Sequence, residues 1–187
     1  MPKIYIDQGH NPSSFNTGAE GNGLREQDVT YAVGQALAML LRRSGNYEVR
    51  LSRNSPDEVL GSSNAGSLRA RVQDANAWGA DYFISIHTNA STDPSARGVE
   101  AYSYARGTRA FELGEDIVDD LVSATGFPDR GMKVRPGLYV LKKTAMPAVL
   151  VEIGFISNPG EAAVMRSDPS LFARGIYEGI VDYTGLD

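Results

Sequence analysis

The chain of 187 residues contains no cysteine, and this absence removes several kinds of chemistry at once. Disulfide bonds, thiolate metal ligands and a cysteine nucleophile are all excluded. The cellular compartment stays open, because secreted proteins need not carry disulfides. Any metal site in this chain must therefore be built from histidine and carboxylate side chains.

Basic runs and long apolar stretches are also missing. The formal net charge is −5 and no basic stripe occurs, so we expect neither nucleic acids nor anionic membrane surfaces as partners. No apolar run approaches the roughly 20 residues that span a bilayer, so we expect no membrane insertion. No secretory signal precedes the first expected strand, which begins at Lys3. Either the protein stays in the cytoplasm, or it leaves by another route, or the chain is a trimmed form of a longer one.

Strand-like apolar runs alternate with helical periodicity, which predicts an α/β fold. The length of 187 residues predicts a single domain over residues 1–187, in which no linker or repeat occurs. A hydrophobic content of 42% and a charged content of 22% argue against disorder. Six strands are expected, at residues 3–7, 48–52, 82–87, 98–104, 138–141 and 148–152. Five helices are expected, one from Glu26 to Gly45, two marked by Leu68 and Leu113, and two capped by Asn158 and Asp168. Asn158 and Glu161 are predicted to form a capping box around Pro159.

Histidine is scarce, and the two that occur lie at the ends of expected strands. His10 follows the strand at 3–7, with Gly9 allowing a sharp turn, and His87 closes the apolar strand at 82–87. Sites in open α/β sheets form at the carboxyl ends of strands, and neutral imidazole is a common metal ligand. The pair predicts a metal centre, although a polar loop histidine and a satisfied structural histidine remain alternatives.

Two histidines are too few for a catalytic zinc site, which usually takes three protein ligands and one water. Without cysteine, the third ligand must be a carboxylate. Glu26 opens the first expected helix, where an acidic residue would also simply complement the helix dipole. Glu20 in the preceding loop and Asp7 are rival ligands.

Glu152 ends the apolar run from Pro147, and carboxylates are almost never fully buried unless they are paired. We therefore expect it to face a cleft, to bind a metal or to transfer a proton, with a purely structural role as the alternative. Asn89 either orients a ligand or is a simple turn residue. No serine nucleophile elbow, phosphate-binding loop, dinucleotide glycine motif or H-E-x-x-H motif occurs.

Four segments occur together in an order that is known from one family. They are Asp7-x-Gly9-His10, Glu26 at a helix start, Ser85 to Ala90 (SIHTNA) and Val151 to Asn158 (VEIGFISN). The chain resembles the zinc-dependent N-acetylmuramoyl-L-alanine amidases of the type-3 class over essentially its whole length. It departs from the family pattern at Gln8, where proline is frequent, and at Asn11-Pro12, where two glycines are frequent.

The resemblance implies a twisted, mostly parallel six-stranded sheet flanked by about five or six helices. It also implies that His10, Glu26 and His87 hold one Zn²⁺ per chain and that Glu152 is the catalytic base. The substrate would then be peptidoglycan, cut between N-acetylmuramic acid and L-alanine of the stem peptide. The enzyme would act on the cell wall.

Three other functions fit parts of the pattern. A zinc peptidase would cut within the stem peptide, and a binding module would hold peptidoglycan without cutting it. Iron oxygenases use two histidines and one carboxylate, but their usual all-β setting does not match the alternation of helices and strands.

Overall fold

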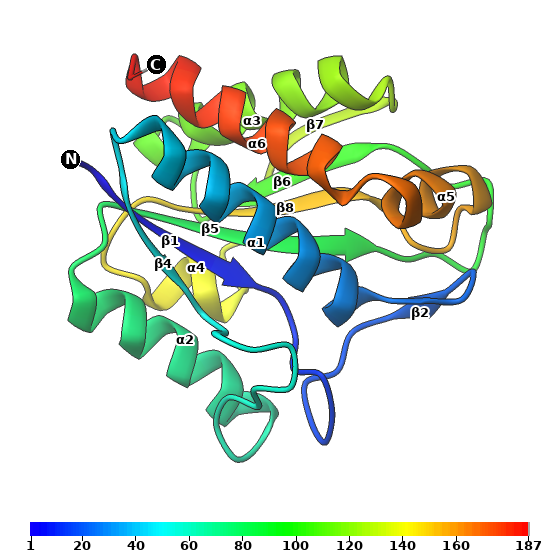
Figure 1. The fold of residues 1–187 in the computed structure, drawn as a ribbon, viewed down its shortest axis with the longest axis horizontal. Coiled ribbons are helices and arrows are strands. Elements are labelled where there is room, and N and C mark those ends of the chain that lie inside the picture. Colours follow the sequence, from blue (N-terminus) through cyan, green and yellow to red (C-terminus); the bar gives the residue numbers. More distant parts are fainter. Residues whose placement is uncertain (187) are drawn as a thin grey trace.

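A six-stranded sheet forms the centre of the molecule, with the strand order β4-β1-β5-β8-β6-β7 (Figure 1). The computed structural model describes residues 1–186. The strands of this sheet are β1 (Lys3–Gln8), β4 (Glu48–Leu51), β5 (Tyr82–Asn89), β6 (Val99–Ser103), β7 (Asp129–Val134) and β8 (Ala148–Phe155). Neighbouring strands run parallel except β6 and β8, which are antiparallel. The predicted mostly parallel, six-stranded sheet is therefore confirmed.

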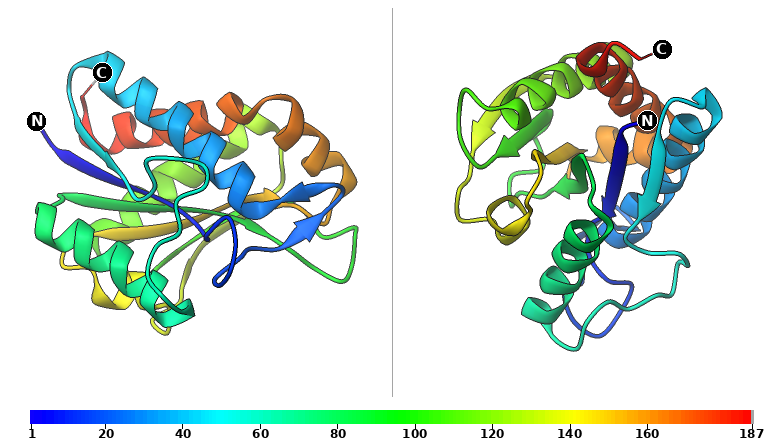
Figure 2. Two further views of the ribbon diagram at one scale, coloured as in Figure 1. Left: turned by 60° about the horizontal axis from the view of Figure 1, so that its bottom comes forward. Right: turned by 90° about the vertical axis from the view of Figure 1, so that its left-hand side faces the viewer.

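Six helices cover the two faces of the sheet (Figures 1 and 2). On one side lie α1 (Glu26–Ser44), α3 (Arg109–Thr125) and α6 (Pro169–Thr184). On the other side lie α2 (Asn64–Trp78) and the short α4 (Tyr139–Lys143), while α5 (Pro159–Ser167) follows β8. Each side has its own buried apolar cluster, because alternate residues of a strand point to opposite faces.

Strand β1 shows how this alternation prepares the two faces. Ile4 and Ile6 pack with α1 and α6, whereas Tyr5 points toward the cluster that includes α2 and α4. Asp7 shares the face of Tyr5 and is fully buried there. The side of the sheet that α2 and α4 cover therefore receives the polar residues near the strand ends.

The expected helix signals at the C-terminal end are confirmed, with one difference. The side chain of Asn158 accepts hydrogen bonds from the backbone N–H groups of Gly160 and Glu161, and that of Asp168 accepts one from Leu171. The capping box is incomplete, because the Glu161 carboxylate accepts from Gly98 and Phe155 instead. Glu161 thus joins β8 and the start of β6 to helix α5.

The predicted strand at residues 138–141 is wrong, because this segment enters helix α4. Val140 and Leu141 are buried on the same side of the helix, which a short apolar run cannot reveal by periodicity. The sixth strand is instead β7, an edge strand that pairs with β6. The expected loop from Gly9 to Gly23 also holds β2 (Glu20–Gly21), which pairs with β3 (Leu24–Arg25).

None of the helices in residues 1–186 combines the length and the apolar character needed to cross a membrane.

Candidate metal centre

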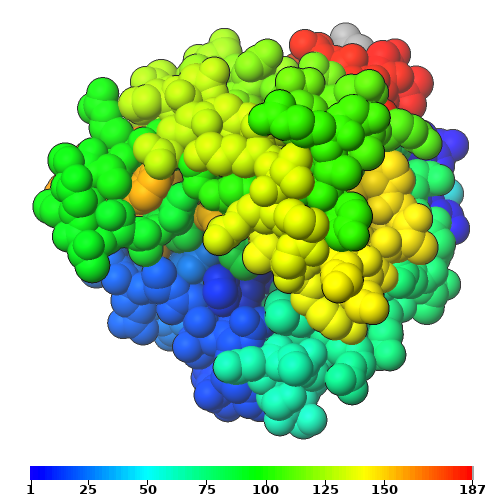
Figure 3. All heavy atoms as spheres, turned by 180° about the vertical axis from the view of Figure 1, so that it is seen from behind, coloured from blue at the N-terminus to red at the C-terminus, as the bar shows by residue number. Residues whose placement is uncertain are grey.

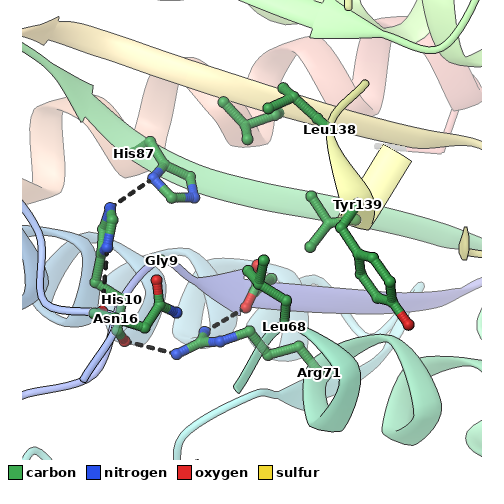
Figure 4. Close-up of a pocket in the computed structure, with 11 residues that line it drawn as sticks. Gly9, His10, Asn16, Leu68, Arg71, His87, Leu138 and Tyr139 are labelled. Atoms are coloured by element: carbon green, nitrogen blue, oxygen red, sulfur yellow. Dashed lines mark hydrogen bonds and ion pairs between the residues drawn. The ribbon is translucent and has the colours of Figure 1, made fainter. Parts of the chain in front are cut away.

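His10 and His87 meet because β1 and β5 are parallel neighbours. Gln8 is in register with Ile86, so both strands end at the same edge of the sheet. His10 lies just beyond β1, and His87 is a residue of β5. Their rings are arranged edge to face, with centroids 4.8 Å apart. Figure 4 shows the two imidazoles pointing toward each other.

Glu26 completes a triangle of ligand atoms with these two histidines. His10 Nε2 lies 3.1 Å from His87 Nδ1 and 3.2 Å from Glu26 Oε1. Glu26 Oε1 lies 3.1 Å from His87 Nδ1. In the described part of the chain, these three residues are the one group of at least three such side chains that converge closely enough to hold a metal ion. The structure therefore brings together the two histidines and the carboxylate favoured by the resemblance.

Helix α1 begins at Glu26, and two backbone groups fix its carboxylate. Oε1 accepts a hydrogen bond from the Thr88 N–H (2.9 Å), and Oε2 accepts one from the Ala19 N–H (2.9 Å). Burial raises the pKa of Glu26, but hydrogen bonds and charge interactions with His10 and His87 outweigh it and hold the pKa well below its ordinary value. The side chain is thus a carboxylate at neutral pH, as a metal ligand must be.

His10 is oriented by the backbone around it. Its φ angle is +69°, a left-handed conformation that turns the chain directly after β1. Its Nδ1 lies 3.2 Å from the carbonyl oxygen of Asn16. A proton on Nδ1 donated to this carbonyl leaves the Nε2 lone pair free toward Glu26 and His87, the arrangement found behind metal-ligating histidines.

Arg71 anchors the turn that carries His10. Its buried guanidinium donates to Asp7 Oδ1 (2.5 Å), to the Gln8 carbonyl (2.6 Å) and to the His10 carbonyl (2.6 Å). Asn11 exchanges two hydrogen bonds with the backbone of Leu60. These contacts join β1, α2 and the loop before α2 beneath the site.

Gly9 leaves space for the His87 ring. A Cβ atom at this position would lie 2.5 Å from the Ile86 carbonyl oxygen and 2.6 Å from His87 Cε1. The first contact is to backbone of the central strand, which cannot move aside cheaply. Glycine is therefore required here by close approach.

Glu152 lies on β8, in register with His87 on the neighbouring strand. The pKa of Glu152 is raised to about 8, mainly by burial and to a smaller extent by the negative charges of Glu26 and Glu100. The positive charge of Arg135 lowers the pKa of Glu152 but does not outweigh these effects. Its Oε2 atom is buried and has no hydrogen-bond partner among the described residues. A buried carboxyl group with a free oxygen and a pKa near neutrality is typical of proton-transfer sites.

Glu100 is a further buried carboxylate, for which the sequence indicated no role. It is the antiparallel register partner of Glu152 and accepts hydrogen bonds from Asn89 Nδ2 (2.8 Å), Arg130 Nε (2.9 Å), Tyr102 Oη and Lys133 Nζ. Burial raises the pKa of Glu100, but the bonds from Lys133, Tyr102 and Arg130 bring it down to about 2. One sequence signal could have revealed this cluster. Glu100 lies within the apolar run of β6, and a carboxylate buried there needs positively charged or hydrogen-bonding partners.

The rival ligands lie elsewhere. Glu20 is exposed on β2, and Asp7 is bonded to Arg71 and to the Ser85 hydroxyl (2.7 Å). Asn89, considered as an orienting residue, donates to Glu100 and to no ligand atom.

A largely apolar cavity of about 140 Å³ adjoins the two histidines. Figure 4 shows His10 and His87 at one end of it and Leu138 and Tyr139 at the other. On this face of the molecule the surface is hollowed, and dark-blue atoms of the N-terminal segment lie there beneath the yellow segment near residue 140 (Figure 3). The cavity beside the two histidines thus has an apolar wall and lies on a hollowed face of the molecule.

The donor set fits a tetrahedral metal ion. Ligands at about 2.0–2.1 Å from zinc lie about 3.3 Å from one another in a tetrahedron, close to the 3.1–3.2 Å sides of the observed triangle. Two imidazole nitrogens and one carboxylate oxygen are ligand types that zinc accepts. Three lone pairs converging on one point also need a cation or a proton between them. These residues are therefore suited to hold a metal ion.

Comparison with known proteins decides the family. The family model described as N-acetylmuramoyl-L-alanine amidase matches residues 4–182. The chain belongs to the N-acetylmuramoyl-L-alanine amidase family. An amidase of Bacillus licheniformis named CwlM is 40% identical over 181 residues, covering 96% of this chain and 66% of that protein. The sporulation-specific amidase of Bacillus subtilis (strain 168) is 37% identical over 186 residues, covering 96% and 67%.

Among solved amidase structures, the catalytic domain of CwlV from Bacillus (Paenibacillus) polymyxa var. colistinus has a TM-score of 0.87 at 30% identity, with both chains fully covered. The resemblance deduced from four short segments and the predicted fold class are both confirmed. The chain spans about two thirds of the length of the two curated amidases described above.

Proposed function

We propose that this chain is a zinc-dependent peptidoglycan hydrolase that cuts the amide bond between N-acetylmuramic acid and L-alanine of the stem peptide. The observation that carries the proposal is the triangle of His10, Glu26 and His87, whose sides of 3.1–3.2 Å match one tetrahedral ion. Membership of the amidase family supports the reaction and the substrate. The proposal treats residues 1–187 as one catalytic domain that acts on the cell wall.

In this proposal His10, Glu26 and His87 each supply one ligand atom, and one zinc ion binds per chain. When bound, zinc lowers the pKa of a coordinated water to about 7 and polarises the scissile carbonyl. The Asn16 carbonyl keeps the His10 proton on Nδ1, and the Thr88 and Ala19 N–H groups hold the Glu26 carboxylate in place. Two of the three side chains that would bind zinc, His10 and Glu26, are thus held in position by backbone groups of the chain.

Glu152 moves the proton. Its free Oε2 accepts a proton from the attacking water, whose oxygen bonds to the lactyl carbonyl carbon. The same carboxyl group then delivers the proton to the nitrogen of L-alanine as the C–N bond breaks. In the metal-free chain, burial and the charges of Glu26 and Glu100 raise the pKa of Glu152, and a metal ion bound by Glu26 would offset part of that rise. A carboxyl group in this setting can both gain and lose a proton near neutral pH.

Muropeptide analysis tests the reaction. Zinc-loaded protein is incubated with purified peptidoglycan, and we expect new L-alanine amino termini together with glycan free of peptide. A zinc peptidase would instead leave L-alanine attached to muramic acid, and a binding module would release nothing. Either of these results would refute the proposal.

Two variants test the assigned roles. Glu152→Gln should keep one zinc per chain and lose about 10²–10⁴-fold in rate, because proton transfer is removed while the ligands remain. His10→Ala should lose stoichiometric zinc, measured by elemental analysis of the folded protein. Full activity of Glu152→Gln, or unchanged zinc in His10→Ala, would contradict the respective role.

A further inference from the structure

The site continues past Glu152 onto β6 and the segment after β7. Glu100 and Tyr102 lie two residues apart on β6 and so face the same side of the sheet, where the Tyr102 hydroxyl donates to the Glu100 carboxylate. Arg135 follows β7, and its backbone N–H donates to the Ser103 carbonyl (3.0 Å). Its guanidinium lies over the Tyr102 ring, 5.1 Å from the centroid. The arginine is thus positioned by its backbone and by one aromatic face.

Arg135 differs from Arg130 and Lys133 of β7, because it has no carboxylate partner among residues 1–186. Arg130 and Lys133 are both bonded to Glu100. The Arg135 side chain is exposed, and within residues 1–186 no carboxylate or carbonyl oxygen accepts a hydrogen bond from it. Stacking on a ring uses the flat face of a guanidinium and leaves its N–H edges free to bind a planar anion.

Two observations connect Arg135 to the reaction site. Leu138 lines both the cavity beside His10 and His87 and an open groove of about 370 Å³ that is also lined by Arg135. The charge of Arg135 also acts on Glu152, lowering a pKa that burial raises. A substrate that extends from the metal centre over Leu138 therefore comes within reach of this guanidinium.

We propose that Arg135 binds a carboxylate of the stem peptide, on the side of the leaving L-alanine; this inference rests on the proposed function. The substrate itself narrows the choice of anion. The carboxyl group of muramic acid is consumed in the scissile amide, and the sugars are otherwise uncharged. The carboxylates near the bond therefore belong to the peptide, and a carboxylate matches the fork of an arginine.

A matched pair of substrates isolates this contact. One preparation of peptidoglycan is divided, and in one half the peptide carboxylates are converted to carboxamides with a carbodiimide and ammonia. We expect the zinc-loaded wild-type protein to release L-alanine amino termini about five- to tenfold faster from the untreated half at low substrate concentration. Arg135→Gln should remove this preference, and Arg135→Lys should keep part of it, because the charge remains without the planar fork.

Arg106→Gln is the control, because Arg106 is also stacked on a ring, that of Phe111, which belongs to α3 on the opposite side of the sheet. It should keep the full wild-type preference. If wild-type shows no preference, or Arg135→Gln retains it, the inference is wrong while the proposed function stands, since both substrates are still cut. If wild-type cuts neither half, the proposed function fails and the inference falls with it.

Discussion

Glu26 Oε1 lies 3.1 Å from His87 Nδ1, and the same oxygen accepts the N–H of the next residue, Thr88. One carboxylate therefore joins the start of α1 to the end of β5, two segments 61 positions apart in the chain. The contact orders both partners before any metal arrives. It also makes Glu26 responsible for two things, the ligand geometry and the docking of α1 against the strand end.

Replacing Glu26 by alanine should abolish stoichiometric zinc binding. The variant loses one of three ligands, and we expect zinc affinity to fall by at least about 100-fold, since disturbing even an outer-shell partner costs 10–100-fold. Elemental analysis and competition with a chelator measure the loss, with circular dichroism to verify the fold. Glu20→Ala, an exposed glutamate on β2, is the matched control and should bind zinc as wild-type does. The reverse pattern would move the ligand to Glu20.

Gly9→Ala should weaken zinc binding although Gly9 is not a ligand. The added Cβ meets the Ile86 backbone at 2.5 Å and the His87 ring at 2.6 Å, so the ring must leave its position beside His10 and Glu26 or the strand must move. We expect a loss of about 10–100-fold in zinc affinity, comparable to other changes behind a ligand. Gly137→Ala is the control, because a Cβ there meets nothing within 4 Å. Equal zinc affinity in the two variants would show that the site tolerates the displacement.

The sequence predicted the parts of the fold that bury apolar side chains. Strands β5 and β8 are rich in apolar residues, and His87 and Glu152 stand out within them, as His10 does directly after β1. Glu26 could not be separated from Glu20 by local pattern alone. The choice depended on the contact with β5, which only the tertiary structure or the family resemblance supplies.

The errors arose where apolar pattern carries little information. Residues 138–141 form an apolar run too short to distinguish a strand from the single turn of helix that α4 forms. Strand β7 (Asp129–Val134) is an edge strand with few apolar residues, so its pairing with β6 left no periodic signal. The cluster around Glu100 was missed because its partners come from three different strands.

Removing Arg71 should destabilise the protein more than an average substitution does. Arg71→Met leaves the buried Asp7 carboxylate with only the Ser85 hydroxyl, whereas the intact pair lowers the pKa of Asp7 against the effect of burial. Breaking a buried ion pair on one side costs about 3–5 kcal/mol, so the free energy of unfolding should fall by that amount. Urea denaturation measures it. Asp7→Asn combined with Arg71→Met should recover part of the loss, and no recovery would mean that the bonds to Gln8 and His10 dominate.

Glu152 should make the metal-free protein less stable as the pH rises. In the folded chain its pKa is raised to about 8, chiefly by burial, whereas in the unfolded chain it lies near the ordinary value of 4.5. Between these values the unfolded chain has lost the proton while the folded chain still holds it. Raising the pH through this window therefore favours unfolding.

Glu152→Gln removes this titration and keeps the shape of the side chain. The melting temperature of the metal-free variant should exceed that of wild-type by an amount that grows from pH 5 to about pH 8 and then levels off. Glu20→Gln, which changes an exposed carboxyl, should give a difference that does not grow in this way. Parallel melting profiles for Glu152→Gln and wild-type would show that the folded carboxyl releases its proton near the ordinary pKa. In that case burial would not hold a proton on Glu152 in the folded chain between pH 5 and pH 8.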